Sequence, residues 1–338
     1  MKLYRWLACA ASKVTLGRML LCAVAITAGT AGAQEAYPSR PIRIVVPLPP
    51  GGPGDALARA IAPPLAKLLN ATVIVENRGG AGGSLGVGYV AKTPPDGYTL
   101  GFVSAGTQSI NPFIYPKLAY DPRKDFEPIS PLASYVNVVL CNPKVPANNM
   151  AELLRAAKAS PGSITFGSGG LGTSTHLTIE TIKYVSGAPL QHVAYRGAAP
   201  AITDLIGGNI ACVVDTLATT LPHVKSGKIK ALAVTGAKRS PYAPEMPTMA
   251  ESGLPNFEEA SGQLWLGLVA PAGTPKPIVD KLNAALQELL RDDPATRKVL
   301  EVLGYDPFSL SPAQFAQYLE RDYEKWGRIV KATGAKAE

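Results

Sequence analysis

The segment Pro47-Leu48-Pro49-Pro50-Gly51-Gly52-Pro53-Gly54-Asp55 decides the fold at the start of this chain. It lies between an apolar run, Ile42 to Val46, that is typical of a buried strand, and an amphipathic run, Ala56 to Leu69, that is typical of a helix. A strand followed by such a turn and a helix directs backbone N–H groups at an anion. Because proline fixes φ, we expect a stiff loop, and because the loop has no nucleophile, the pattern favours anion binding over catalysis.

Residues 1–33 have the features of a secretory signal peptide. Four basic residues and no acidic residue precede or flank an apolar run, Met19 to Ala28, which ends at Ala31-Gly32-Ala33. The run is shorter than the roughly 20 residues that a membrane-spanning helix needs. We therefore expect cleavage near residue 33 and export to the periplasm.

The charge of the chain argues against a nucleic-acid partner. The formal net charge is +8, and removal of the four basic leader residues lowers it to +4. No run of Lys and Arg is present, and basic and acidic residues alternate along most predicted helices. A weak positive field is compatible with a small anionic ligand. We expect a monomer without a cofactor.

Two cysteines, Cys141 and Cys212, remain after processing, and each belongs to a β-branched apolar run. Burial as two free thiols is the interpretation that the pattern favours. A disulfide is the alternative in an oxidising compartment, but the sequence does not give the separation of the two Cα atoms.

The mature chain alternates strands and helices, which predicts an α/β fold with largely parallel sheets. Strands are expected at 42–46, 72–76, 98–103, 163–166, 191–195, 210–214, 230–234 and 265–270, and helices at 56–69, 85–91, 150–159, 175–185, 199–206 and 217–225. Residues 238–262 are expected to form loops, and two long helices, the second starting at Pro312, are expected to end the chain.

This alternation predicts two domains. Residues 34–130 with 263–338 are assigned to domain 1 and residues 131–262 to domain 2, with hinge segments at about 128–140 and 262–270. Ligands bind outside the carboxyl ends of the strands in open α/β sheets. The candidate ligand residues come from the loops at those ends and are Pro50, Gly51, Gly52, Gly54, Asp55, Gly83, Ser84, Thr107, Ser168, Gly172, Thr173, His176, Tyr195, Arg196 and Asp215.

Several of these residues also have a structural interpretation. Asp55 and Asp215 could contact the ligand or cap a helix. Arg196 could pair with a second carboxylate of the ligand or form a structural salt bridge. His176 is expected to stabilise its helix, and Tyr195 could offer its hydroxyl or pack.

Enzyme classes fit the sequence poorly. Gly167-Ser168-Gly169-Gly170-Leu171-Gly172 matches the dinucleotide fingerprint, but no acidic residue follows about 20 positions later. Ser168 has Phe166 where a serine hydrolase needs glycine, and the three histidines lack metal-ligand spacing. We expect neither catalysis nor a metal.

The chain resembles the Bug-type extracytoplasmic solute receptors of tripartite tricarboxylate transporters, from about residue 37 to residue 334. The matching motifs are Pro49-Pro50-Gly51-Gly52 with Asp55, Glu76-Asn77-Arg78 through Gly86, Pro95-Asp96-Gly97-Tyr98-Thr99-Leu100, Tyr120-Asp121-Pro122, Gly172-Thr173 with His176-Leu177, His192 to Gly197, and Ala270 to Pro275. Leu48 and Arg196 depart from the family, in which an aromatic residue and a lysine are frequent at these positions.

This resemblance implies a type-II periplasmic-binding-protein fold that closes on a small carboxylated solute. One carboxylate would be held by backbone groups of both domains and by ordered water, with the loops around Gly51 to Asp55 and around Gly172 and Thr173 as the two sides. The implied function is delivery of the solute to the membrane subunits of a tripartite tricarboxylate transporter. A secreted sensor that presents the closed form to a signalling protein is the alternative, and a secreted hydrolase is the third hypothesis.

Overall fold

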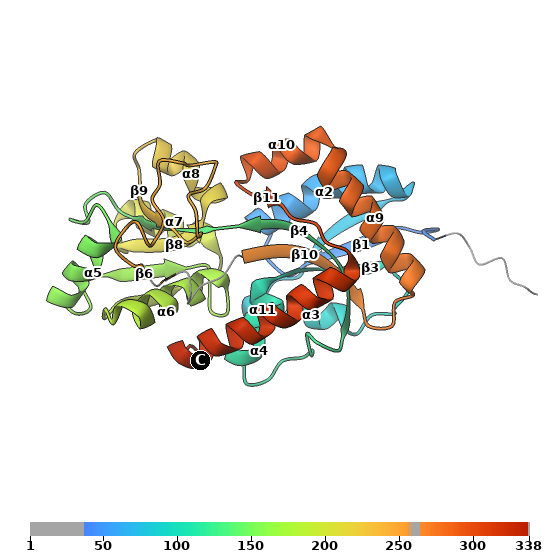
Figure 1. Ribbon diagram of the computed structural model, residues 1–338, viewed down its shortest axis with the longest axis horizontal. Coiled ribbons are helices and arrows are strands. Elements are labelled where there is room, and N and C mark those ends of the chain that lie inside the picture. Colours follow the sequence, from blue (N-terminus) through green and yellow to red (C-terminus); the bar gives the residue numbers. More distant parts are fainter. Residues whose placement is uncertain (1–36, 256, 258–263, 337–338) are drawn as a thin grey trace, which may run out of the picture. The chain divides into compact units, whose positions relative to one another are not determined.

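The computed structural model describes residues 37–255, 257 and 264–336. Two sheets organise these residues (Figure 1). The predicted signal peptide at residues 1–33 lies outside the described residues. None of the described helices combines the length and the apolar character that a membrane crossing requires.

The first sheet has six strands in the order β11-β4-β10-β3-β1-β2. Their bounds are β1 Ile42–Val46, β2 Val73–Asn77, β3 Thr99–Ser104, β4 Phe126–Tyr135, β10 Leu264–Pro271 and β11 Asp306–Pro307. Strand β1 lies parallel to both β2 and β3, so the loops that follow these three strands share one edge of the sheet.

The second sheet has five strands in the order β7-β6-β8-β5-β9. Their bounds are β5 Asn137–Cys141, β6 Thr165–Ser168, β7 Gln191–Ala194, β8 Cys212–Thr216 and β9 Lys230–Val234. Strand β6 is parallel to β7 and β8, whereas β5 is antiparallel to β8 and β9.

The expectation of largely parallel sheets is wrong, because both sheets are mixed. Strand β10 pairs antiparallel with β3 and β4, and β5 pairs antiparallel with both of its neighbours. These strands belong to the segments that connect the two sheets: β4 ends at Tyr135 and β5 begins at Asn137 (Figure 1). Parallel pairing of consecutive strands needs a crossover connection, usually a helix. A strand that connects the two sheets has no such crossover, so it can pair antiparallel with its neighbours.

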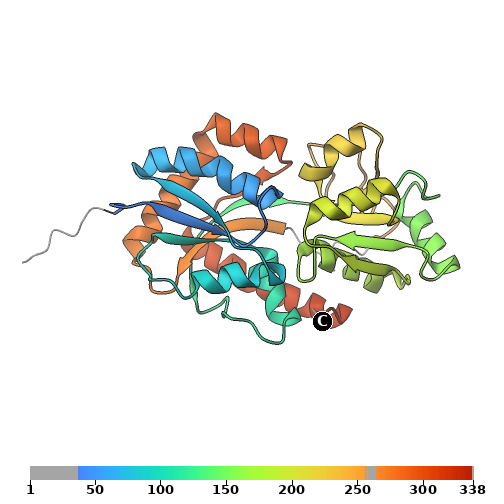
Figure 2. The ribbon, with the colours of Figure 1, turned by 180° about the vertical axis from the view of Figure 1, so that it is seen from behind.

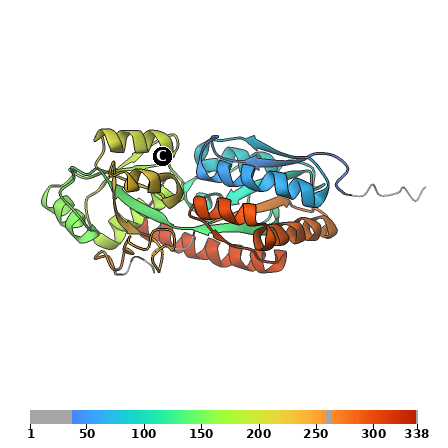
Figure 3. The same cartoon turned by 90° about the horizontal axis from the view of Figure 1, so that it is seen from above.

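Helices cover both sheets. Their bounds are α2 Pro53–Leu69, α3 Ser84–Val90, α4 Asn111–Ile114, α5 Met150–Ala159, α6 Ser174–Ser186, α7 Ala198–Gly207, α8 Leu217–Lys225, α9 Lys276–Asp292, α10 Pro294–Val302 and α11 Pro312–Thr333, with a 3₁₀ turn η1 at Ala81–Gly83 and a π-helical turn η2 at Gly106–Ile110. Helices α9 and α11 lie in front of the six-stranded sheet in Figure 1, and α2 and α3 lie in front of it in the reverse view of Figure 2. Helix α11 contacts both β4 and α6, and Figure 3 shows this helix from above.

The hydrophobic core of the five-stranded sheet is divided between its two faces. Val139, Phe166 and Val214 pack with side chains from α5 and α6 on one face. Val138 and Val213 pack with side chains from α7 and α8 on the other. Neighbouring strand residues thus alternate between faces, as the pleat of a strand requires.

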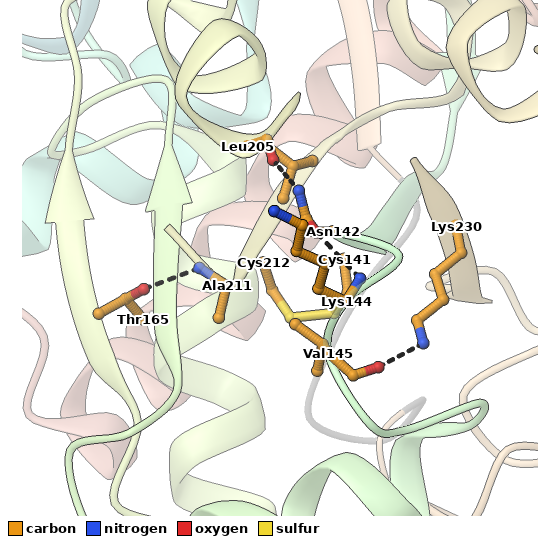
Figure 4. Close-up of a disulfide and its surroundings, with 9 residues drawn as sticks. All are labelled: Cys141, Asn142, Lys144, Val145, Thr165, Leu205, Ala211, Cys212 and Lys230. Atoms are coloured by element: carbon orange, nitrogen blue, oxygen red, sulfur yellow. Dashed lines mark hydrogen bonds between the residues drawn. A yellow bond between two sulfur atoms is a disulfide. The ribbon is translucent and has the colours of Figure 1, made fainter. Parts of the chain in front are cut away.

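Cys141 and Cys212 form a disulfide (Figure 4), so the interpretation as two free thiols is wrong. Both residues are fully buried. They lie directly opposite each other in the antiparallel pair of β5 and β8, which brings their side chains within bonding reach. The sequence could not show this, because the register of β5 against β8 depends on the topology of the whole sheet.

Most predicted elements are confirmed, and the differences have local causes. The helices at 150–159 and 217–225 and the strands at 42–46 and 230–234 have the predicted bounds. Two closing helices were expected, but α10 lies between α9 and α11. Pro294 cannot continue α9, and it begins α10 at a position where its missing N–H costs nothing.

Candidate functional site

Three loops of the six-stranded sheet meet at the carboxyl ends of β1, β2 and β3. A Cβ atom placed on Gly83 would lie 2.8 Å from the Thr107 side chain and 3.3 Å from the carbonyl oxygen of Pro47. A Cβ atom on Gly79 would lie 3.2 Å from the backbone nitrogen of Pro49. Gly83, Ser84 and Thr107 are buried at this junction. The structure therefore brings three of the predicted residues, Gly83, Ser84 and Thr107, together at this junction.

The carboxylate of Asp55 forms hydrogen bonds that hold the Pro/Gly loop, so it is not free. Its oxygens accept hydrogen bonds from the Gly51 N–H at 2.9 Å, from the Asn77 amide at 2.9 Å and from the Arg59 guanidinium at 3.0 Å. Asn77 also donates to the carbonyl oxygen of Leu48 at 3.1 Å. Burial tends to raise the pKa of Asp55, but these hydrogen bonds outweigh burial and hold the pKa below its usual value.

The start of α2 has backbone N–H groups that are without a side-chain cap among the described residues. Gly52 is the N-cap residue, and it has no side chain that could accept from the first turn. The first N–H that the helix itself uses at this end is that of Ala56, which donates to the Gly52 oxygen. The backbone N–H groups of Gly54 and Asp55 precede it in the first turn, where a helix supplies no acceptor. An anion is stabilised there by the donors and by the helix dipole.

A second set of loops follows β6 and β7 of the five-stranded sheet. The N–H of Gly197 donates to the Gly169 oxygen at 3.1 Å, which ties the two loops together. Gly197 caps α7 without a side-chain hydrogen bond, so the N–H groups of Ala198 and Ala199 in the first turn have no acceptor within the helix, whereas Pro200 has no N–H. Arg196 precedes it, is exposed, and has no salt-bridge partner among the residues that the structure describes.

The two sets of loops contact each other. The Tyr115 hydroxyl donates to the carbonyl oxygen of Leu171 at 3.1 Å. A Cβ atom on Gly172 would lie 2.6 Å from the Asn111 side-chain oxygen and 2.7 Å from the Tyr115 ring. The carboxyl ends of the parallel strands of both sheets therefore face the same region.

Asn111 and Tyr115 escaped the sequence analysis. They follow the π-helical turn η2, and no periodic pattern marks that turn in the sequence. Asn111 is fully buried and donates to the Gly82 oxygen and the Ser84 hydroxyl, both at 3.0 Å. The side-chain oxygen of Asn111 has no partner among the described residues.

The polar side-chain atoms of three predicted ligand residues form hydrogen bonds with other groups of the protein. Ser168 is fully buried, and its hydroxyl lies 2.7 Å from Nε2 of His192. The Tyr195 hydroxyl donates to Asp204 at 2.7 Å. The Gly172 N–H donates to Nδ1 of His176 at 3.3 Å, and burial lowers the pKa of His176 to about 3. His176 therefore supports the loop that precedes its helix, whereas the structural interpretation expected it to stabilise the helix.

The remaining predicted residues lie at the helix starts or just before them. Pro50 and Gly51 are exposed ahead of α2. Thr173 caps α6 by accepting from the His176 N–H at 3.3 Å. Asp215 is buried at the end of β8 and accepts from the Thr216 N–H and the Thr219 hydroxyl, both at 2.8 Å.

The arrangement of two mixed sheets with facing loops defines a class: the chain has the type-II periplasmic-binding-protein fold that the family resemblance implies. Residues 57–335 match the family model described as "Tripartite tricarboxylate transporter family receptor". The chain belongs to this family and is a periplasmic solute-binding receptor of the Bug type, not an enzyme.

Solved structures agree with this assignment. The periplasmic binding protein BugD is 36% identical, with a TM-score of 0.82, and the match covers 89% of this chain and 100% of BugD. Rpa4515 of R. palustris with adipate is 34% identical, with a TM-score of 0.84 and coverage of 89% and 100%. MatC (Rpa3494) of Rhodopseudomonas palustris with bound malate is 32% identical, with a TM-score of 0.79 and coverage of 87% and 100%.

Proposed function

We propose that this protein captures a small organic carboxylate between its two predicted domains and delivers it to a tripartite tricarboxylate-type transporter. The observation that carries the proposal is the pair of uncapped helix starts, α2 and α7, on loop sets that contact each other through Tyr115 and Leu171. Backbone donors and the positive end of the helix dipole at two helix starts suit an anionic group such as a carboxylate.

Two similar structures support the ligand class, because Rpa4515 holds adipate and MatC holds malate. Both ligands are dicarboxylates. Arg196 is exposed and precedes the α7 start, and we propose that its guanidinium pairs with a second carboxylate of such a ligand. Leu48 adds an apolar side chain on the α2 side.

Closure of the two domains around the solute is the proposed mechanism. Ligand binding favours the closed form by the difference in its affinity for the two forms. The bond between Tyr115 and Leu171 and the close packing of Gly172 against Asn111 are contacts that the closed form would gain. The transporter would recognise this form.

Delivery is tested by deleting the gene in its host and measuring uptake of the carboxylate that binds best. The proposal expects lost uptake, restored by the wild-type gene and not by a variant that no longer binds. If uptake persists while transcription of a ligand-responsive gene is lost, the protein is instead the alternative, an exported sensor. Turnover of carboxylic esters by the purified protein would favour a hydrolase.

A further inference from the structure

His176, Glu180 and His192 form a cluster inside the five-stranded half of the molecule. His176 and Glu180 are one turn apart on α6, so their side chains share a face of that helix. Strand β7 places His192 against this face, and the two imidazole rings stack with 4.6 Å between their centroids. One potential ligand atom from each residue lies within 4.8 Å of the other two.

We propose that His176, Glu180 and His192 bind a divalent transition-metal ion, with Zn²⁺ as the best match. Two imidazoles and one carboxylate are a common zinc ligand set, and they leave a fourth position for water. Ligand atoms on one tetrahedral zinc ion are about 3.4 Å apart, given bonds of roughly 2.0–2.2 Å. The ligand atoms must therefore approach one another from at most 4.8 Å to about 3.4 Å, which requires the partly buried Glu180 side chain to rotate and the two rings to shift slightly when the ion binds.

Ser168 orients one of the imidazoles for this role. Its hydroxyl oxygen lies 2.7 Å from Nε2 of His192 and can accept a hydrogen bond from the N–H at that nitrogen. The lone pair is then on Nδ1, which remains for the ion. Metal-bound histidines typically donate their second nitrogen in this way, which fixes the tautomer and the ring orientation.

Metal binding would change the partner of the Gly172 backbone. Nδ1 of His176 currently accepts from the Gly172 N–H. A neutral imidazole has one lone-pair nitrogen, so coordination of the ion removes this acceptor. The loop that contacts Asn111 and Tyr115 would then have a free backbone donor, which connects the metal to the proposed ligand site.

Lys183 competes with the ion for Glu180. Its Nζ atom lies 2.9 and 3.0 Å from the two carboxylate oxygens. The Lys183 side chain is 34% exposed, so it can turn to solvent when an ion replaces its charge. Removal of Lys183 should therefore strengthen metal binding, whereas removal of a ligand should weaken it.

The test is calorimetric titration of the full mature protein, purified without a polyhistidine tag, with Zn²⁺ alone. We expect one ion per molecule, a loss of affinity of at least about tenfold in Glu180→Gln and in His192→Ala, and a gain in Lys183→Ala. His223→Ala is the matched control, because His223 is the third histidine of the chain and lies outside the cluster, in the last turn of α8. The His223→Ala protein should bind Zn²⁺ as tightly as the wild type.

Visible absorption of the Co²⁺ complex provides a second readout, since imidazole and carboxylate ligands give a four-coordinate spectrum that Glu180→Gln should alter. Thermal unfolding without metal verifies that each variant folds. The proposal is overturned if neither the wild-type protein nor Lys183→Ala binds Zn²⁺ stoichiometrically. It is also overturned if folded Glu180→Gln and His192→Ala proteins bind as tightly as the wild type.

Discussion

Asp215 is a buried carboxylate at the end of β8 whose ionisation opposes folding. Burial raises its pKa from 3.8 to about 6, although the Thr216 N–H and the Thr219 hydroxyl favour the charged form. Between these two values the folded protein holds a proton that the unfolded chain has lost. Its stability therefore falls as the pH rises through this window, and the whole penalty remains above pH 6.

Asp215→Asn should remove this penalty. A shift of about two pKa units corresponds to roughly 3 kcal/mol, so we expect the free energy of unfolding to rise by up to about that amount at pH 7.5 and to change little at pH 4. The nearby Tyr135 and Tyr305 stay neutral in this range, because burial raises their pKa values. Urea unfolding at both pH values measures the effect; an equal gain at pH 4 and pH 7.5 would contradict the assignment to ionisation.

Asp55 shows the opposite behaviour, because its charge is fully used by hydrogen bonds. Asp55→Ala would leave the Gly51 N–H and the Asn77 amide without their acceptor, and we expect a loss of about 2–3 kcal/mol in the free energy of unfolding. Arg59→Ala is the control: Arg59 is half-exposed, so its ion pair should contribute at most about 1 kcal/mol. Equal losses in urea unfolding would mean that Asp55 does not hold the loop.

At the scale of elements, the loop between β6 and α6 is placed by Gly172. Its φ of +77° is unfavourable for other residues, and a Cβ atom would collide with Asn111 and Tyr115. The contact between the two loop sets therefore depends on the absence of a side chain at this position.

Gly172→Ala should weaken carboxylate binding by tenfold or more, because the closed form is lost. Gly187→Ala is a matched control: Gly187 also has a positive φ, +60°, but no atom of the described residues other than its chain neighbours lies within 4 Å of the added Cβ. The control should lose about 1 kcal/mol of stability and bind normally. Calorimetry on both variants decides the matter, and normal affinity in folded Gly172→Ala would remove this loop from the site.

The disulfide joins β5 to β8 across 71 residues of sequence. Closing a loop of this length stabilises a protein by about 4 kcal/mol in the chain-entropy model. The double variant Cys141→Ala/Cys212→Ala should therefore unfold at a clearly lower temperature than the oxidised wild type. Added reductant should lower the midpoint of the wild type and leave that of the variant unchanged. Equal midpoints for variant and oxidised wild type would show that the bridge contributes nothing.

For the whole molecule, the sequence predicted the elements better than their pairing. Alternating apolar periodicity is local, so α5, α8, β1 and β9 could be placed to the residue. The antiparallel pairing of β5 with β8 and of β10 with β3 joins strands that are far apart in sequence, and no local pattern encodes it. The division into two domains remains a prediction, because part of the second connecting segment lies outside the described residues.

The candidate site was predictable in part for the same reason. Gly, Ser and Thr at strand ends marked the loops of Gly83 and Thr107 correctly as neighbours. The inward hydrogen bonds of Ser168 and Tyr195 could not be foreseen, because their partners His192 and Asp204 follow from the packing of α6, α7 and β7. The assignment of each residue to the ligand stays a prediction.

Carboxylate capture is the central claim, and calorimetric titration of the purified mature protein tests it most directly. The panel contains di- and tricarboxylates that include adipate and malate, aromatic acids and acidic amino acids, each matched with its uncharged amide. We predict that one carboxylate class binds at one molecule per chain and raises the unfolding temperature, while its amide does neither. Binding of the amides with equal affinity, or of uncharged solutes alone, would contradict the account.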